Sequence, residues 1–492
     1  MEQQPSNILD FVASKVQDSV PVTIPLCVDL DGTLVNTDTL WESFLQLCKK
    51  NPIVAFLSLF YIFKGKQYFK ANIANKVHLD PTCLPYNHRF MEYLKAERMQ
   101  GRKLILITGT YQSIAQSVAD HLGIFDEVHG TNLHTNLIGV NKEDYLVNLI
   151  GEKKFLYAGN SHDDLKVWRS SYGGIAVNTS AKLLKLAKEN CTIFQVFSAS
   201  KNKFSSLIKA MRIYQWVKNT LIFLPLFAAH RVDEFDLSFK LVWAFFAFSF
   251  CASSVYLLND LLDLTADRKH PLKRRRPFAA GHLSLKFGIF FSPVLLVVGV
   301  AIAFKISAGF GLMILGYYAL TCAYSFKLKE LLLIDVLVLT ILYNWRVLSG
   351  ALATGISLSP WLLGFMSFLF YSLALAKRSS ELQLMLKHNK KKPGGRSYII
   401  DDLNLINMLG SASGLLAVLI LALYINSSKI QLLYSKPYLL WPVCFAMLYW
   451  ISRVWLITGR GKMHQDPIVF ALKDPSSYWV GLFSFVLAIL AV

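Results

Sequence analysis

The sequence predicts a two-domain protein, with a Rossmann-like α/β domain over residues 1–200 and an all-α bundle of transmembrane helices over residues 201–492. Charge and hydropathy support this division. Residues 1–200 hold 20 of the 51 Lys and Arg and 19 of the 32 Asp and Glu, which leaves 31 basic and 13 acidic residues for the remainder. Long apolar runs concentrate in that basic remainder. A chain of 492 residues is long enough for two domains.

The charge distribution also indicates the class of partner. A basic excess that accompanies apolar spans favours anionic lipids and phosphates, and we expect no nucleic acid because the basic residues fall in short loops between spans. The seven cysteines are scattered without a CxxC spacing, so neither a zinc site nor a disulfide framework is predicted. The first 20 residues lack the pattern of a signal peptide, so we expect the α/β domain to remain in the cytoplasm.

Three short apolar runs in the first domain end in polar side chains. They cover residues 25–31 (PLCVDLD), 103–110 (KLILITGT) and 155–164 (FLYAGNSHDD), with a lysine-led amphipathic segment, KEDYLVNLI, between the last two. Buried parallel strands read as continuous apolar runs, and open α/β sheets bind ligands at the carboxyl ends of their strands. We therefore expect the polar side chains after these runs to meet at one edge of a sheet.

The four segments resemble, in order, the motifs of haloacid-dehalogenase (HAD) superfamily phosphatases. The resemblance implies that Asp29 is the nucleophile that forms an aspartyl-phosphate and that Asp31 is the general acid/base. It implies that Thr108 and Lys142 hold the transferring phosphoryl group. A Mg2+ ion is expected on Asp29, Asp31, Asn160 and Asp164. Asn160 stands where the family most often has Asp, which predicts weaker metal affinity.

Residues 38–100, between the first two motifs, have the right size for a small helical cap. They include the apolar run 52–63 (PIVAFLSLFYIF), with lysines on both sides. Twelve residues are too few to cross a bilayer, so the run is either a buried helix or a helix that lies in the membrane interface.

The second domain contains nine apolar runs that we interpret as transmembrane helices. They cover residues 217–230, 239–258, 284–304, 307–325, 331–352, 360–376, 405–425, 437–457 and 476–492. The loops on one side carry most of the Lys and Arg, which places that side in the cytoplasm together with the α/β domain. We therefore expect a multi-pass protein of the inner cell membrane.

The segment NDLLDLTAD after the second run carries the most specific pattern of this domain. Asn259, Asp263 and Asp267 lie four residues apart, so a continuing helix would place them on one face. Oxygen ligands on one face favour Mg2+, which bridges carboxylates to phosphates, and the basic cluster at 273–276 would bind further phosphate oxygens. The sequence therefore predicts a second Mg2+ site, for a diphosphate substrate.

This segment and YSFKLK at 324–329 resemble the UbiA superfamily of intramembrane prenyltransferases. HPLKRRRPFAAG, WRVLSGALATGISLSPW and AKRSSEL are more narrowly similar to the decaprenyl-phosphate phosphoribosyltransferase branch, which moves ribose 5-phosphate from phosphoribosyl pyrophosphate (PRPP) to a polyprenyl phosphate. Aromatic prenyltransferases usually carry a second DxxxD motif after the sixth span. This chain has Lys377, Arg378 and Glu381 there, which favours two anionic substrates over a neutral aromatic acceptor.

The resemblance implies roles for individual residues of the second domain. Asn259, Asp263 and Asp267 would hold Mg2+ on the PRPP diphosphate, with Asp260 nearby. Arg346 lies within an apolar run, where an unpaired charge costs about 2.5–3.5 kcal/mol, so we expect an anionic partner for it. The full set of expected phosphate- and substrate-binding residues is Lys218, Asp260, Lys273, Arg274, Arg276, Tyr324, Lys329, Arg346, Lys377 and Arg378.

Together the two domains predict consecutive reactions: transfer of ribose 5-phosphate from PRPP to polyprenyl phosphate, then removal of the 5-phosphate to give polyprenyl-phosphoryl ribose. Each domain would use one Mg2+ ion, and the chain could form a homo-oligomer. One alternative is a prenyltransferase that moves a prenyl chain from a prenyl diphosphate to an aromatic acceptor, with a HAD domain of separate phosphatase or binding role. Another is a membrane-anchored regulatory protein whose HAD domain only binds a phosphorylated metabolite.

Overall fold

The computed structural model describes residues 20–198, 203–387, 396–463, 467–471 and 473–492. The chain divides into two compact units. Unit 1 comprises Met1–Ala210 and Asp260–Ile289, and unit 2 comprises Met211–Asn259 and Phe290–Val492. The segment that follows the first long membrane helix therefore packs with the α/β domain.

Unit 1 is built on a six-stranded parallel sheet with strand order β3-β2-β1-β4-β5-β6. Its strands are β1 (Leu26–Val28), β2 (Leu104–Tyr111), β3 (Glu127–Thr131), β4 (Leu156–Gly159), β5 (Gly173–Val177) and β6 (Ile193–Phe197). Cys27 of β1 pairs with Ile105 of β2 and Tyr157 of β4. From β1 the chain first adds strands on one side of the sheet, β2 and β3, and then crosses to add β4, β5 and β6 on the other side. The carboxyl ends of the two strands at such a switch point, here β1 and β4, usually form the ligand-binding crevice.

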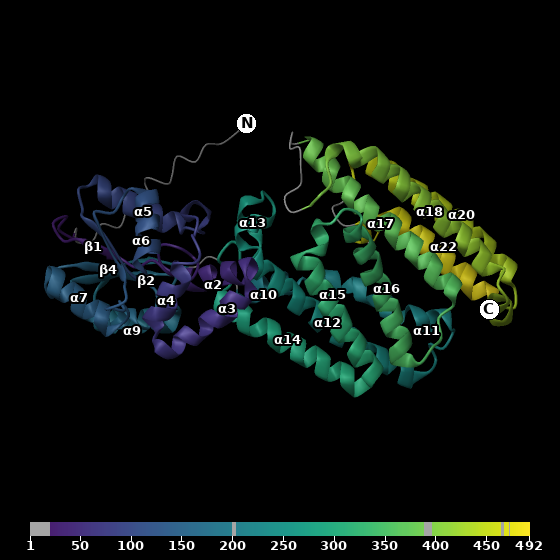
Figure 1. Ribbon diagram of the computed structural model, residues 1–492, viewed down its shortest axis with the longest axis horizontal. Coiled ribbons are helices and arrows are strands. Elements are labelled where there is room, and N and C mark those ends of the chain that lie inside the picture. The colour runs from purple at the N-terminus through teal and green to yellow at the C-terminus, as the bar shows by residue number, and fades with distance from the viewer. Residues whose placement is uncertain (1–19, 199–202, 388–395, 464–466, 472) are drawn as a thin grey trace. The chain divides into compact units, whose positions relative to one another are not determined.

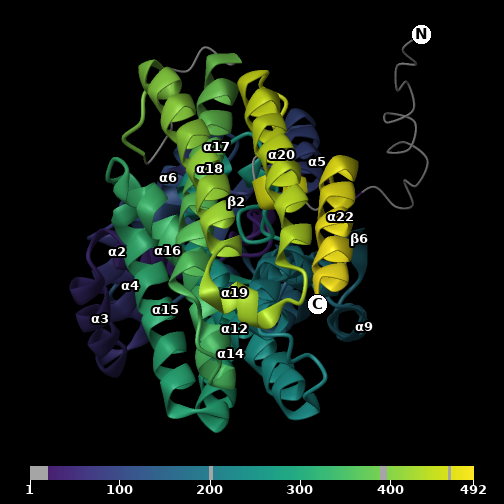
Figure 2. The same cartoon turned by 90° about the vertical axis from the view of Figure 1, so that its right-hand side faces the viewer.

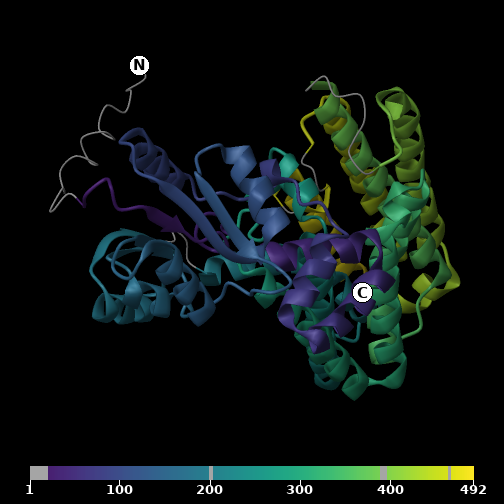
Figure 3. The same cartoon turned by 60° about the vertical axis from the view of Figure 1, so that its left-hand side comes forward.

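Helices cover both faces of this sheet (Figures 1 and 3). Alternate residues of β1 enter different cores: Leu26 and Val28 pack toward one face and Cys27 toward the other. The first face is covered by α5 (His88–Met99) and α6 (Gln112–Leu122), and the second by α7 (Val140–Ile150), α8 (Asp164–Ser170) and α9 (Ala181–Asn190). The α/β fold predicted from the apolar runs is confirmed.

The segment between β1 and β2 forms a helical subdomain. It contains α2 (Thr39–Lys50), α3 (Pro52–Leu59), the 3-10 turn η1 (Phe60–Lys64), α4 (Lys66–Ala74) and η2 (Pro81–Cys83). Leu47, Ala55, Phe69 and Ile73 form its small core. The outer face of α3 and η1 is exposed, and we call it the cap patch: Ile53, Phe56, Leu57, Phe60, Ile62 and Phe63. The buried-helix interpretation of residues 52–63 is wrong for this face.

Unit 2 is a helical bundle. Seven described helices are long and apolar enough to cross a membrane: Phe235–Leu262, Leu285–Ile306, Ala308–Phe326, Ile334–Thr354, Pro360–Leu386, Ile400–Ile425 and Pro437–Gly459. They contain α12 (Phe235–Leu262), α14 (Leu285–Ile306), α15 (Ala308–Phe326), α16 (Ile334–Thr354), α17 (Pro360–Lys387), α18 (Leu403–Ile425) and α20 (Trp441–Gly459). Figure 2 shows α15 to α18 and α20 running alongside one another, with α22 (Pro475–Ala491) beside α20.

The predicted count of nine transmembrane helices is not confirmed. The first run, 217–230, falls in the 3-10 segment η3 (Ile213–Phe223) and the five-residue helix α11 (Leu224–Ala228). The last run forms α22, whose 17 residues are fewer than a typical span. The remaining short elements of the described chain are α10 (Lys203–Met211), α13 (Leu264–Lys269), η4 (Lys273–Arg275), η5 (Leu328–Glu330), η6 (Ile400–Asp402), α19 (Ser428–Leu433), η7 (Pro437–Leu440) and α21 (Pro467–Ala471).

Candidate active sites

Asp29 follows β1 and contacts Lys142 of α7. Lys142 donates from Nζ to Asp29 Oδ1 at 2.8 Å and to the Tyr157 hydroxyl at 3.0 Å. Both charged side chains are buried. Burial raises the pKa of Asp29 to about 6, and the Lys142 ammonium opposes this rise. The expected nucleophile and the expected phosphoryl-binding lysine are therefore brought together in a site with little water.

Asp31 is held by two threonines that are not among the residues expected from the motifs. Its Oδ1 accepts the backbone N–H of Thr39 at 2.9 Å, and its Oδ2 accepts the Thr110 hydroxyl at 2.7 Å. Burial, followed by repulsion from Asp38, raises the pKa of Asp31 to about 7. A carboxyl group that titrates near neutral pH can both donate and accept a proton, as a general acid/base requires. The sequence offered one signal for Thr110, which is a second hydroxyl side chain two residues after Thr108 at the end of the same apolar run.

The last motif forms a fixed turn after β4. Asp164 accepts the Tyr157 hydroxyl at 2.6 Å with Oδ1, and Oδ2 accepts the backbone N–H groups of Asn160 at 2.9 Å and Ser161 at 2.8 Å. Tyr157, which sequence reasoning missed, thus connects Asp164 with Lys142. The Oγ1 of Thr108 accepts the Thr110 backbone N–H at 3.1 Å, so its hydroxyl proton remains suited to a phosphoryl oxygen.

The donors at this edge fit Mg2+ in chemistry. Asp29 and Asp164 supply carboxylate oxygens, and Asn160 supplies an amide oxygen, which are the hard ligands that Mg2+ prefers. Asn160 packs over Gly32, whose φ is +75°; a Cβ on Gly32 would lie 1.8 Å from Asn160 Nδ2, so only glycine fits. In the described chain no three or more His, Cys, Asp or Glu are grouped to hold a metal ion. A Mg2+ site here would therefore depend on Asn160 and on water.

Lys70 of α4 is a further buried cation near this site. Its Nζ donates to the backbone carbonyl of Gly109, and to Asn136 Oδ1 at 2.9 Å. Burial lowers the pKa of Lys70 to about 8, while Asp31 opposes the decrease. Lys70 was not predicted, because a lysine on a cap helix resembles any solvated surface lysine.

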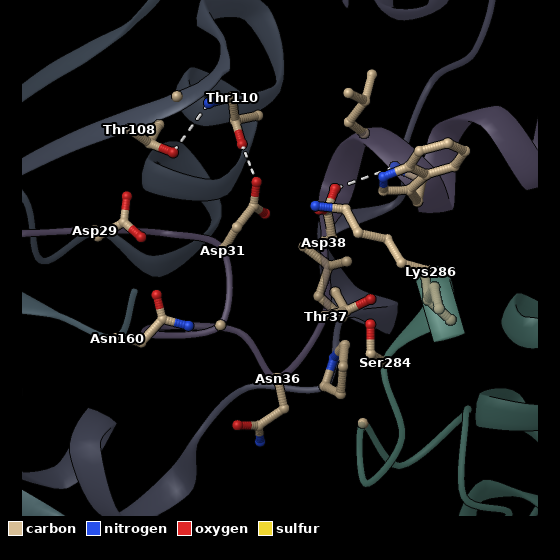
Figure 4. A pocket seen from close by; sticks show the side chains of 18 of the residues that line it. Asp29, Asp31, Asn36, Thr37, Asp38, Thr108, Thr110, Asn160, Ser284 and Lys286 are labelled. Carbon is tan, nitrogen blue, oxygen red and sulfur yellow. Dashed lines mark hydrogen bonds and ion pairs between the residues drawn. The ribbon is translucent and has the colours of Figure 1, made fainter. Parts of the chain in front are cut away.

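These residues line a pocket with a volume of about 1440 Å³. Figure 4 shows Asp29, Thr108 and Asn160 in one part and Thr37 and Asp38 in another. The opposite wall belongs to the part of unit 1 around the start of α14, and includes Ser284 just before that helix and Lys286 in its first turn.

The aspartate segment is partly helical. The helix α12 ends at Leu262, Asp263 interrupts it, and α13 begins at Leu264, although Asp267 N–H still donates to the Asp263 carbonyl at 2.8 Å. The expected uninterrupted helix is therefore wrong. Asn259 is the last residue of its stretch of unit 2, and the three aspartates belong to unit 1.

Arg276 lies between two of these aspartates. Its Nη1 is 3.0 Å from Asp260 Oδ1 and 2.6 Å from Asp267 Oδ2. Burial raises the pKa of Asp267, and Arg276 opposes that rise. Lys49 of α2 forms an ion pair with Asp263. Lys273 and Arg274 lie at the exposed turn η4. Arg276 is therefore ion-paired with two of the acids, whereas Lys273 and Arg274 are exposed and Arg274 lines the pocket.

In unit 2, Arg346 of α16 is buried among neutral groups. It donates from Nε to Asn219 Oδ1 at 2.9 Å and from Nη2 to the Tyr317 hydroxyl at 3.0 Å. Its guanidinium lies 5.5 Å from the centre of the Tyr343 ring, and the ammonium of buried Lys218 lies 6.0 Å from the same ring centre. Among the described residues no carboxylate forms an ion pair with Arg346. Lys218 and Arg346, far apart in sequence, thus gather at one aromatic side chain.

Arg378 of α17 has a different environment. It lies 2.6 Å from Asp335 and 2.6 Å from Glu381, and it donates to the Tyr324 hydroxyl at 3.2 Å. The structure brings the expected residues Tyr324 and Arg378 together, but two carboxylates already neutralise the arginine. Lys329 and Lys377, which also belong to the expected set, are half-buried, the first in η5 after α15 and the second within α17.

Two family models match the chain. The UbiA prenyltransferase family matches residues 220–473, and haloacid dehalogenase-like hydrolase matches residues 26–168. The uncharacterized protein y4nM of Sinorhizobium fredii is 35% identical over 461 residues, which are 93% of this chain and 89% of that protein.

Two further relatives match part of the chain. Nodulation protein NoeC of Azorhizobium caulinodans is 33% identical over 279 residues, which are 57% of this chain and 91% of NoeC. Decaprenyl-phosphate phosphoribosyltransferase of Mycolicibacterium smegmatis is 37% identical over 188 residues, which are 37% of this chain and 59% of that enzyme.

Proposed function

This chain belongs to the UbiA prenyltransferase family and also carries a HAD-like hydrolase domain, and we propose that it catalyses two consecutive reactions on a membrane lipid. The first transfers ribose 5-phosphate from PRPP to a polyprenyl phosphate and releases diphosphate. The second hydrolyses the 5-phosphate of that product to give polyprenyl-phosphoryl ribose and inorganic phosphate.

The chain is an integral membrane protein, because its described residues include seven apolar helices of spanning length and it belongs to an intramembrane enzyme family. We propose that it lies in the inner membrane with residues 1–200 in the cytoplasm and residues 201–492 as the transferase. Positive charge in the loops on one side supports that orientation.

For the transfer step, a polyprenyl phosphate oxygen would attack C1 of ribose as the bond from C1 to the diphosphate breaks. Asn259, Asp263 and Asp267 would hold Mg2+, which neutralises charge on the departing diphosphate. Lys218 and Arg346 are our candidates for the lipid phosphate. The supporting observation is the burial of Arg346 among neutral groups of the described chain: an unpaired charge in a span is costly and an anionic substrate would offset the cost.

For the phosphatase step, Asp29 would attack phosphorus and Asp31 would protonate the departing ribose oxygen. Water would then hydrolyse the aspartyl-phosphate, with Asp31 taking the proton of that water. Lys142 and Thr108 would bind the phosphoryl oxygens, and Mg2+ on Asp29, Asn160 and Asp164 would supply further positive charge. The observation that carries this step is the buried contact of Lys142 with Asp29, next to Asp31 held by Thr39 and Thr110.

The test is mass spectrometry of the lipid products of purified full-length protein supplied with PRPP, a polyprenyl phosphate and Mg2+. Wild type should form lipid-phosphoryl ribose, and Asp29→Asn should accumulate lipid-phosphoryl ribose 5-phosphate. Asp144→Asn is the matched control, because Asp144 is exposed on α7, and it should behave as wild type. Consumption of no PRPP by wild type would refute the transferase assignment and would direct the assay to prenyl diphosphates with aromatic acceptors.

A further inference from the structure

The phosphatase pocket is larger and more basic than one phosphomonoester requires. Its volume of about 1440 Å³ exceeds the roughly 300–1,000 Å³ of most small-molecule sites. Of the described residues that line it, nine are Lys or Arg and five are Asp. Three of these aspartates, Asp29, Asp31 and Asp164, belong to the catalytic motifs. The excess positive charge is suited to a substrate with a second anionic group.

Several of these cations come from the loop 268–286, which follows the aspartate segment. Lys269, Arg274 and Lys286 line the pocket together with Ser284. In Figure 4 Lys286 extends toward Asp38, and its Nζ lies 2.9 Å from Asp38 Oδ2. Asp31 lies between Asp29 and Asp38 in that view. The catalytic carboxylates therefore line one part of the pocket, and Lys286 lines another part of the same pocket.

The loop is fixed to the cap by buried contacts. Arg268 forms two hydrogen bonds to the Glu42 carboxylate, one of 3.0 Å from Nη2, and only 7% and 2% of the two side chains are exposed. Gly281 approaches so closely that a Cβ on it would lie 2.3 Å from the Asn36 carbonyl oxygen. These close contacts, which include a buried ion pair, fix the position of the loop as one wall of the pocket.

The place of Lys286 in the chain indicates where the second anion comes from. Lys286 is the second residue of α14, whose 22 residues form one of the candidate membrane spans. A cation at the end of a span lies at the depth of lipid phosphates. Its side chain is 56% exposed, so the ammonium can contact an anion while it remains near Asp38.

We propose that the loop 268–286 forms a second anion subsite of the phosphatase pocket, which binds the phosphodiester of a lipid-linked sugar 5-phosphate while Asp29 attacks the terminal phosphate. This inference rests on the proposed phosphatase function and specifies its substrate class. Lys286 is the specificity-determining residue of the subsite. The phosphatase would therefore select the lipid-linked product over free ribose 5-phosphate, which has no second phosphate, although the chemistry at phosphorus is the same for both.

The experiment measures phosphate release by the full-length protein from three substrates: ribose 5-phosphate, ribose 1,5-bisphosphate and farnesyl-phosphoryl ribose 5-phosphate. For wild type, we expect kcat/KM for the farnesyl compound to exceed that for ribose 5-phosphate at least about tenfold. Lys286→Ala should reduce this ratio about fivefold, the size of effect typical of a half-exposed charge contact. Lys286→Arg should restore most of it, and the exposed control Lys182→Ala on α9 should leave it unchanged.

The three substrates separate the possible sources of the preference. A gain for the bisphosphate that Lys286→Ala also removes assigns the preference to the second phosphate, as proposed. A gain confined to the farnesyl compound and insensitive to Lys286→Ala assigns it to the apolar chain and overturns the inference. Equal kcat/KM values for all three in wild type also overturn it while the phosphatase function stands. If the wild-type protein releases phosphate from none of the three substrates, both the phosphatase function and the second anion subsite are refuted.

Discussion

The cap patch predicts that the cap of the HAD-like domain contacts the lipid surface, and Phe63→Glu is the sharpest perturbation of that contact. Phe63 is 88% exposed and Ile53 is 73% exposed. Lysines lie at both ends of the patch, with Lys49 and Lys50 at the end of α2 and Lys64 after Phe63. An apolar helix face with basic flanks is the pattern of a segment that lies in an anionic membrane interface.

The magnitude follows from the exposed area. A phenylalanine buries roughly 150–250 Å², so an 88% exposed ring offers about 130–220 Å² for transfer. At about 25 cal/mol per Å², full insertion would contribute about 3–5 kcal/mol, and insertion of half the ring about 2 kcal/mol. Since about 1.4 kcal/mol is a factor of ten, Phe63→Glu should weaken docking of the cap at least about thirtyfold.

The assay uses full-length protein in nanodiscs that contain phosphatidylglycerol and a lipid with a photoreactive group on its acyl chain. Trypsin releases residues 51–64 as one peptide, because Lys50 and Lys64 flank it, and mass spectrometry measures its labelled fraction. Phe63→Glu should reduce that fraction at least about tenfold. Met99→Glu is the matched control, because Met99 of α5 is also 88% exposed, and it should have no effect. Wild-type labelling of this peptide no higher than that of α9 would refute the reasoning.

Three further predictions concern pH, stability and the transfer step. Thr110→Val removes a hydrogen bond that lowers the pKa of Asp31, so that pKa should rise. The protonated acid should then persist to higher pH, and the alkaline limb of the pH profile of phosphatase kcat/KM should move up by as much as about one pH unit. A downward shift of that limb would contradict this role of Thr110. Glu42→Gln leaves buried Arg268 without its carboxylate and should lower the free energy of unfolding of unit 1 by about 3 kcal/mol in chemical denaturation, whereas Glu143→Gln, on α7, should cost less than about 1 kcal/mol. Arg346→Gln should lower transferase kcat/KM at least about a hundredfold. The melting temperature should not fall, because the substitution removes a buried charge that has no carboxylate partner among the described residues. A large drop in melting temperature with normal transfer would show a structural role for Arg346 instead.

The strands and the polar residues at their carboxyl ends could be predicted because both are local patterns. A continuous apolar run such as 25–28, followed by acids, specifies a buried strand and its carboxyl end without reference to the rest of the chain. The hydrogen-bond partners of these acids are not local: Thr39 and Thr110 reach Asp31 from other elements, and Tyr157 bonds the lysine that contacts Asp29. Their side chains are common in any strand or helix end, so no pattern distinguishes them before the fold is known.

The first apolar run of the second domain shows why hydropathy alone does not establish a membrane span. Hydropathy treats residues 217–230 as a continuous segment, but Lys218 and Asn219 within it are buried and face a polar cluster. Asn219 hydrogen-bonds both Ser249 of α12 and Arg346 of α16. Contacts of this kind favour a short 3-10 segment that lies against the bundle over a regular helix that crosses the bilayer. Polar residues inside an apolar run therefore argue for a broken element next to a binding site, and the run containing Lys218 belongs with Arg346 as one candidate site for the lipid phosphate.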